Sequence, residues 1–290
     1  MNPGTSVVSS EPPSEARRKA LLTLMGDEDG AIYQTVRTQI LSLGPSVREW
    51  LRPHLLSDDP LLRRRVREVF DHFGRQTADN RFLAFCLKQG EDLDLEAGAF
   101  LLAQTRHPDA PVEACQAQLD LFADTLRGRA SRIAGAKCLL NAINKFLFVE
   151  QGFAGNERDA YNPEFSYLTS VMDSRRGVPI SLCVIYLCIA RRLHLPVSGI
   201  GLPGHFVCRF QSSTEEIYVD CFNRGRLMTK ADCISYLLSG NHDLREETLQ
   251  PLSPRRILMR MCGNLHRTYY HHRNAEETTR LQRYLVALAR

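Results

Sequence analysis

The stretch Arg175–Pro196, RRGVPISLCVIYLCIARRLHLP, contains the longest apolar run of the chain. The run leaves a Gly-Val-Pro turn at 177–179 and continues without a break to Ala190, which predicts a buried helix beginning near Pro179. Proline suits a first helical turn because its φ is fixed and it has no N–H to leave unpaired. The helix also carries two cysteines, one of them Cys183, so its sequence raises the question of a catalytic nucleophile.

The composition indicates a globular protein. The 290 residues are 43% hydrophobic, enough for one large domain or two ordinary ones. The net charge of +4 comes mainly from arginine and lacks the concentrated basic patch expected of a nucleic-acid binder. The N-terminus has no signal-peptide pattern, and the run from Gly177 to Ala190 is too short to span a bilayer. We therefore expect a cytoplasmic protein that binds neither nucleic acid nor a membrane.

The cysteine and histidine patterns give no metal or cofactor signature. Nine cysteines are scattered without a Cys-x-x-Cys pair, which is typical of reduced thiols buried as small hydrophobic side chains. Near the C-terminus, His266, His271 and His272 include only one adjacent pair, and their spacing does not suit a metal site. We expect no metal and no cofactor.

Composition and periodicity divide the chain into four segments. Residues 1–17 are rich in Ser, Pro and Glu and are expected to form a disordered tail. Residues 18–90 have a helical pattern that resembles one HEAT-type repeat, with a helix start at Asp58-Asp59-Pro60. Residues 91–240 form the central domain. Residues 241–290 resemble a tetratricopeptide-type helical hairpin, which either closes the core or packs against a partner. The fold class is therefore α+β and helix-dominated.

Alternation of period two begins only after Gly204. Residues 204–222, GHFVCRFQSSTEEIYVDCF, predict two antiparallel strands joined at Gln-Ser-Ser-Thr. With the turn centred between residues 212 and 213, His205 faces Asp220 and Arg209 faces Glu216. Opposite residues have Cβ atoms about 4.5 to 5.5 Å apart, so we expect Asp220 to accept a hydrogen bond from the His205 ring. A histidine satisfied by a nearby acid is also an ordinary structural pair, so the pair alone does not identify an active site.

Two strings resemble the transglutaminase-like superfamily: RRGVPISL at 175–182 and PGHF at 203–206. Together they are similar to its SirB-type subgroup of bacterial proteins, over about residues 92–290. The resemblance implies a papain-like core, in which a buried helix packs on an antiparallel sheet with cysteine at the helix start and histidine and aspartate on adjacent strands. His205 and Asp220 match that histidine and aspartate.

The nucleophile position departs from this pattern. Catalytic members of the superfamily open the central helix with Gly-x-Cys, about seventeen residues before a proline that leads into the next strand. Counting back from Pro196 places Pro179 at the cysteine position. Because proline has no nucleophilic atom, the resemblance implies a scaffold that has kept its fold and lost its chemistry.

Other residues that could replace the nucleophile are Cys183, Ser181 and Cys221, and alternation turns Cys221 toward the opposite face from Asp220. Cys183 lies on the same helix face as Pro179 but about 6 Å farther along the axis, where apolar neighbours are expected to keep it inert. Ser181 is turned about 200° away from Pro179 and is expected to bond backbone groups at the helix start.

Two functions of different class follow. The leading hypothesis is a non-catalytic interaction or regulatory module that binds a protein or peptide in a groove lined by Pro179, Ser181 and Gly204. The alternative is a cryptic cysteine hydrolase or acyltransferase in which His205 and Asp220 activate Cys183. The alternative requires a nucleophile within about 3.5 Å of the His205 ring.

Overall fold

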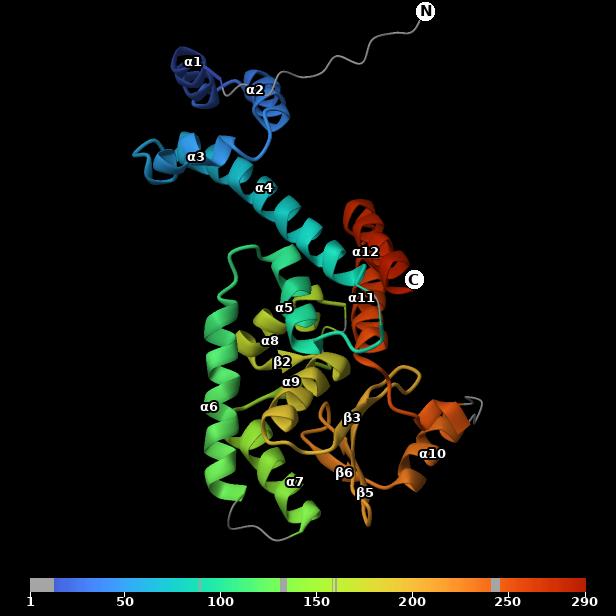
Figure 1. Ribbon diagram of the computed structural model, residues 1–290. Coiled ribbons are helices and arrows are strands. Elements are labelled where there is room, and N and C mark those ends of the chain that lie inside the picture. The colour runs from blue at the N-terminus through green and yellow to red at the C-terminus, as the bar shows by residue number, and fades with distance from the viewer. Residues whose placement is uncertain (1–12, 89, 131–134, 158, 160, 241–245) are drawn as a thin grey trace, which may run out of the picture. The chain divides into compact units, whose positions relative to one another are not determined.

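A computed structural model describes residues 13–88, 90–130, 135–157, 159, 161–240 and 246–290 (Figure 1). The chain forms two compact units, one ending at Thr77 and the other running from Ala78 to Arg290. The predicted fold class is confirmed, since helices dominate and the strands form two small sheets. Most of the expected tail, residues 1–12, lies outside the described part of the chain.

The first unit is helical. Its elements are α1 (Glu15–Met25), α2 (Gly30–Ser42), α3 (Val47–Leu51), the 3-10 turn η1 (Arg52–Leu56) and the first part of α4 (Pro60–Cys86). The expectation that the disordered tail reaches residue 17 is wrong, because α1 already begins at Glu15, where the Ser14 side chain accepts a hydrogen bond from Arg17 N. As predicted, α4 begins at Pro60, with Asp59 Oδ1 2.8 Å from Leu61 N. The likeness of this unit to a HEAT repeat stays a prediction.

The second unit holds the remaining elements. Its α-helices are α5 (Leu95–Arg106), α6 (Val112–Ala130), α7 (Ala136–Lys145), α8 (Leu168–Ser174), α9 (Pro179–Arg192), α10 (Lys230–Ser239), α11 (Pro254–His271) and α12 (Ala275–Leu288). Shorter turns are η2 (Phe146–Glu150), η3 (Pro163–Ser166) and η4 (Glu246–Leu249). The strands β1 (Ala154–Gly155) and β2 (Arg176–Gly177) pair in parallel, while β3 (Val197–Ile200), β4 (Val207–Gln211), β5 (Glu216–Asp220) and β6 (Arg226–Met228) form an antiparallel sheet in that order.

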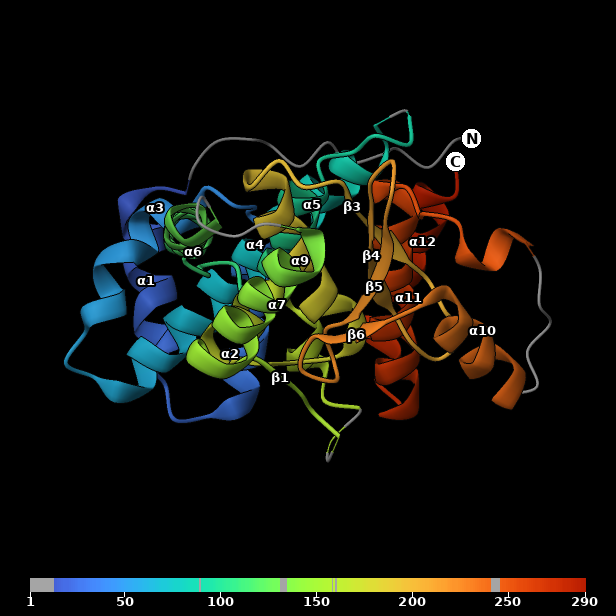
Figure 2. The same cartoon turned by 90° about the horizontal axis from the view of Figure 1, so that it is seen from below.

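Helix α9 is the central element of this unit. It begins at Pro179, as its sequence predicts, and nearly every residue from Ile180 to Ala190 is buried. It contacts α6 on one side and strands β3 and β4 on the other, an arrangement visible in Figure 2. A helix that is apolar all round is stable only when it is enclosed on all sides, and this enclosure explains the unbroken apolar run of its sequence.

The hairpin of β4 and β5 has a different register from the one predicted. Cys208 pairs with Val219, and Arg209 pairs with Tyr218 rather than with Glu216. The turn is centred one residue later than expected, because the Ser212 side chain accepts hydrogen bonds from the backbone N–H groups of Thr214 and Glu215 and closes the turn around them. The resulting shift of two residues keeps every side chain on its predicted face of the sheet.

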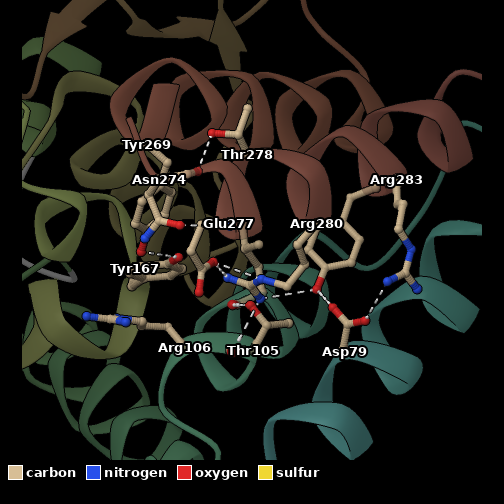
Figure 3. A network of polar contacts seen from close by, with 12 residues as sticks. Asp79, Thr105, Arg106, Tyr167, Tyr269, Asn274, Glu277, Thr278, Arg280 and Arg283 are labelled. Carbon is tan, nitrogen blue, oxygen red and sulfur yellow. Dashed lines mark hydrogen bonds and ion pairs between the residues drawn. The ribbon is translucent and has the colours of Figure 1, made fainter. Parts of the chain in front are cut away.

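The C-terminal hairpin closes the core of the second unit. The apolar faces of α11 and α12, including Leu258 and Leu281, join the same hydrophobic cluster as α9. A polar network fastens α12 to α4 and α5 (Figure 3): Tyr284 donates a hydrogen bond to Asp79, and an Arg280 nitrogen lies 3.3 Å from the backbone oxygen of Thr105. One face of the hairpin is thereby committed to its own domain. In the described part of the chain, no helix is long and apolar enough to cross a membrane.

Candidate functional site

The start of α9 is built by close packing around Gly177. A Cβ atom at this glycine would lie 2.7 Å from the Ser181 hydroxyl oxygen, so a side chain has no room there. The Ser181 hydroxyl is within donating distance of two carbonyls, 2.8 Å from Phe165 O and 2.9 Å from Val178 O. Ser181 is fully buried and fixes the turn that leads into the helix. The prediction that Ser181 bonds backbone groups at the helix start is thus confirmed, whereas its expected place in the lining of the groove is not found, because the side chain is fully buried.

His205 and Asp220 are neighbours. His205 Nε2 lies 3.0 Å from Asp220 Oδ2, and both side chains are largely buried. The distance is that of a hydrogen bond, but the ring N–H does not point at a partner with hydrogen-bond geometry, so we describe the contact as a close polar pair. The structure thus brings together the two side chains that the sequence placed opposite each other, with a less well aligned contact than expected.

Asp220 is held by the turn that follows β5. Its Oδ1 accepts hydrogen bonds from the backbone N–H of Phe222 at 3.1 Å and of Asn223 at 3.2 Å, and its Oδ2 accepts one from Asn223 Nδ2 at 2.8 Å. Burial opposes ionisation of this carboxyl, but the contact with His205 and the Asn223 hydrogen bonds outweigh it, so the pKa of Asp220 is lower than usual. Asp220 is therefore a buried, ionised carboxylate facing the imidazole.

The His205 ring is fixed from two further sides. It packs edge-to-face against the Phe222 ring, with ring centroids 6.0 Å apart, and at a tilt against the Tyr236 ring, with centroids 5.9 Å apart. Its backbone carbonyl accepts a hydrogen bond from Arg260 at 2.6 Å. The residue before it, Gly204, has φ of +70°, a conformation that favours glycine and lets the chain turn into β4.

A pocket of about 330 Å³ opens where three elements meet. It lies between the start of α9, the loop that precedes β4, and α11. Its lining residues are Pro179, Ile180, Pro203, Gly204, His205, Phe206, Arg260, Gly263, Asn264 and Arg267. Pro179, Gly204 and His205 therefore share one pocket. A larger hollow of about 730 Å³ lies between α6 and α8, and neither Pro179 nor His205 lines it.

Sequence reasoning missed the wall that α11 contributes. Arg260, Gly263, Asn264 and Arg267 recur at helical spacing, so they lie on one face of the helix. The apolar stripe of the same helix is visible in its sequence, but its polar face resembles an ordinary solvated surface. The sequence signal for this wall is that the polar face of α11 carries Arg260 and Arg267 and no acidic residue.

Cys183 lies outside the pocket. It is fully buried, and its Sγ is 3.5 Å from the carbonyl oxygen of Phe206. Burial raises the pKa of the Cys183 thiol well above its usual value. Among the described residues, only Cys183, Cys208 and Cys221 form a group close enough to hold a metal ion, with ligand atoms within 4.8 Å of one another. As expected, all nine cysteines are free thiols, and most of them are buried.

The family profile described as transglutaminase-like superfamily matches residues 113–263, a span that includes α9, the four-stranded sheet and the His205–Asp220 pair. The chain belongs to the transglutaminase-like superfamily. In this transglutaminase-like fold the central helix begins at Pro179, which lines the same pocket as His205.

Named relatives come from bacteria and from vertebrates. The chain is 32% identical to a UPF0162 protein of Xylella fastidiosa over 185 residues, which cover 62% of this chain and 66% of the relative. It is 32% identical to human F-box only protein 21 over 232 residues, which cover 69% of this chain and 36% of that protein. A UPF0162 protein of Pseudomonas aeruginosa is 30% identical over 186 residues, covering 62% of this chain and 66% of the relative. The chain thus matches about two thirds or less of each relative's length. No solved structure matched it.

Proposed function

We propose that this transglutaminase-like chain is a non-catalytic module that binds a protein or peptide partner. One observation carries the proposal: Pro179 stands at the first position of α9 and lines the same pocket as His205. A nucleophile at that position would line the pocket next to His205, and proline offers no nucleophilic atom. The pocket, with His205 in its lining, remains available for binding.

The alternative of a cysteine hydrolase or acyltransferase receives less support. Its nucleophile, Cys183, is fully buried, has a raised thiol pKa and does not line the pocket that holds His205. A reactive thiolate instead requires partial exposure and a positive environment. These observations favour binding over covalent catalysis.

The relatives support a modular role. The region shared with F-box only protein 21 is about a third of that protein, so the same fold occurs there inside a longer chain. A fold that is combined with other segments is suited to recognise a partner. The name F-box only protein 21 describes that relative and assigns no partner to this chain.

The experiment tests binding with a variant that fills the pocket. Gly263 lines the pocket, and a Cβ built on it has no atom of another part of the chain within 4 Å, so Gly263→Phe has room to begin a side chain that occupies the pocket. Gly128→Phe is the matched control, because Gly128 lies on α6, away from the pocket, and has equal room. A random peptide library would be selected on the wild-type chain, and the selected peptides titrated against all three proteins.

We expect peptides that bind the wild type and Gly128→Phe equally and lose at least about tenfold in affinity on Gly263→Phe. Mass spectrometry should recover them uncleaved and unmodified. Peptides that bind Gly263→Phe as well as wild type would overturn the pocket as the binding site. Cleaved or acyl-transferred peptides would overturn the non-catalytic assignment.

A further inference from the structure

The pocket beside His205 carries more positive charge than the protein itself balances. We infer that it binds an oxyanion, a carboxylate or a phosphate, carried by the peptide partner. This inference rests on the proposed function, since it names the chemical group that such a peptide presents.

Two arginines of α11 supply the charge. Arg260 and Arg267 both line the pocket and stand two helical turns apart on the same face. No ion pair joins either guanidinium to an acid among the described residues, in contrast to Arg191, Arg192 and Arg280, which contact carboxylates. No acidic residue lines the pocket either. Two unneutralised guanidinium groups beside one cavity are an arrangement that an anion stabilises.

Arg260 is oriented by the loop that precedes β4. One of its terminal nitrogens donates to the backbone carbonyls of Leu202 and His205, and its guanidinium lies over the Phe206 ring, 5.5 Å from the centroid. Carbonyl oxygens satisfy hydrogen bonds without cancelling the charge. Burial, and after it the nearby charge of Arg267, lower the pKa of Arg260, and the second cause reflects two positive charges close together.

The other walls of the pocket also suit an anion. The first turn of α9 contributes Pro179 and Ile180 to the lining, so the positive end of its helix dipole lies at the pocket. Asn264 adds an amide that can donate hydrogen bonds. The nearby carboxylate of Asp220 lies behind the His205 ring, outside the lining, where Asn223 and backbone N–H groups already bind it.

The size of the pocket favours a group on a peptide. A volume of about 330 Å³ is roughly that of one or two residues, and both arginines belong to the wall that α11 contributes. Binding of a nucleic-acid backbone instead requires a basic track along the surface, and the net charge of +4 offers no such excess.

The test uses the full chain and four pools of acetylated hexapeptides. The first pool has free C-terminal carboxylates, the second has amidated termini with an internal glutamate, the third has amidated termini with an internal phosphoserine, and the fourth is amidated and neutral. Equilibrium dialysis at low salt measures retention of each pool. The variant Arg267→Gln removes one charge at an exposed position, and Arg256→Gln removes the same charge from an exposed position of α11 outside the pocket.

We expect at least one oxyanion pool to bind about fivefold or more tightly than the neutral pool, with the difference shrinking as salt is added. Arg267→Gln should lower the affinity for that pool about three- to tenfold, and Arg256→Gln should lower it less than twofold. Asn264→Asp changes the size of the side chain little but places a carboxylate in the pocket. It should lower the affinity for the oxyanion pool more than about tenfold.

Two outcomes distinguish a failure of the oxyanion site from a failure of the proposed peptide-binding function. If the neutral pool binds as well as the others, is lost with Gly263→Phe and ignores Arg267→Gln, the oxyanion site is overturned and the peptide-binding function stands. If no pool binds but inorganic phosphate raises the melting temperature of wild type and not of Arg267→Gln, the oxyanion site stands and the peptide function is overturned. Absence of both effects overturns both proposals.

Discussion

Asp220 Oδ2 lies 3.0 Å from His205 Nε2, although the two residues are not opposite each other in the sheet. The ladder pairs Cys208 with Val219, and one further step along it would set Asp220 opposite Val207. The contact is therefore diagonal. It forms at the open end of the hairpin, because His205 lies in the loop just before β4 and Asp220 is the last residue of β5. Side chains on the same face of neighbouring strands can meet in this way even when their backbones are not paired.

The Asp220→Asn variant should be less stable at neutral pH. It keeps the size of the side chain but places an amide nitrogen where Oδ2 accepts from Asn223 and faces His205. We expect a loss of about 1.5 to 3 kcal/mol in the free energy of unfolding, measured by urea denaturation at pH 7. Asp124→Asn is the control, because its ion pair with Arg127 is exposed and should contribute less than about 1 kcal/mol.

The effect of Asp220→Asn should depend on pH in one direction. Because the pKa of Asp220 is lowered on folding, its carboxylate stabilises the protein above the unfolded-state pKa of about 4, and this stability is lost as the pH falls through the lower folded-state value. The gap between wild type and variant should thus be full at pH 6 to 7 and narrow below about pH 4. A gap that widens on acidification would contradict the assigned charge.

A nucleophile introduced at residue 179 should become reactive. In Pro179→Cys the thiol stands in the first turn of α9, where unpaired N–H groups and the helix dipole favour a thiolate beside His205. We expect faster alkylation by iodoacetamide than at any native cysteine, and a fall in that rate when His205→Ala is added. Loss of proline should lower stability by about 0.4 to 1 kcal/mol, which leaves the chain folded.

The background for this labelling experiment should be Cys138→Ser, since Cys138 is the exposed native thiol. Peptide mapping after alkylation assigns the label to residue 179. If the folded Pro179→Cys protein were alkylated no faster than an ordinary thiol, Pro179 would not occupy the nucleophile position. The same conclusion would follow if its alkylation rate did not change when His205→Ala is added.

Native Cys183 should resist alkylation. The side chain is fully buried and its thiol pKa is raised, so both access and thiolate population are low. In the native wild-type protein we expect iodoacetamide to modify Cys138 first and to leave Cys183 unmodified, with both modified in urea. Equal alkylation rates of Cys138 and Cys183 in the native protein would contradict the non-catalytic proposal and favour a cysteine enzyme.

A buried ion pair at the far end of α9 should contribute strongly to stability. Glu96 of α5 is almost fully buried and contacts Arg192 at 2.5 and 2.9 Å and Arg191 at 3.0 Å. Glu96→Gln leaves these arginines without their buried counter-charge, and we expect a loss of about 3 kcal/mol in urea denaturation. Asp120→Asn also removes a contact to Arg192, but from an exposed carboxylate, and should cost less than about 1 kcal/mol. Equal losses would contradict the role of burial.

Local chemistry made several elements predictable. Proline at a first helical turn marks the start of α9 at Pro179 and of α4 at Pro60, and both helices begin there. Alternation of period two predicts the β4–β5 hairpin and the face of each side chain. The register was missed by two residues because the hydrogen bonds of Ser212 decide the position of the turn, and the sequence offers two similar serines at that point.

The candidate site was predictable only in part. His205, Asp220 and Pro179 stand in strings with a family resemblance, so their neighbourhood could be inferred. For Ser181 the sequence predicted correctly a hydrogen bond to the backbone at the helix start, but the position of the Phe165 carbonyl, which excludes Ser181 from the pocket lining, is decided only by the tertiary structure.

The sequence by itself determined the buried helix, the absence of a nucleophile at Pro179 and the two strands of the hairpin that follows His205 and ends at Asp220, because helix caps, proline chemistry and alternation act over a few neighbouring residues. Only the tertiary structure decided that Arg260 and Arg267 face this site. They lie more than fifty residues from His205 along the chain, and α11 reaches the start of α9 because its apolar face is buried in the core, which turns its polar face to the pocket.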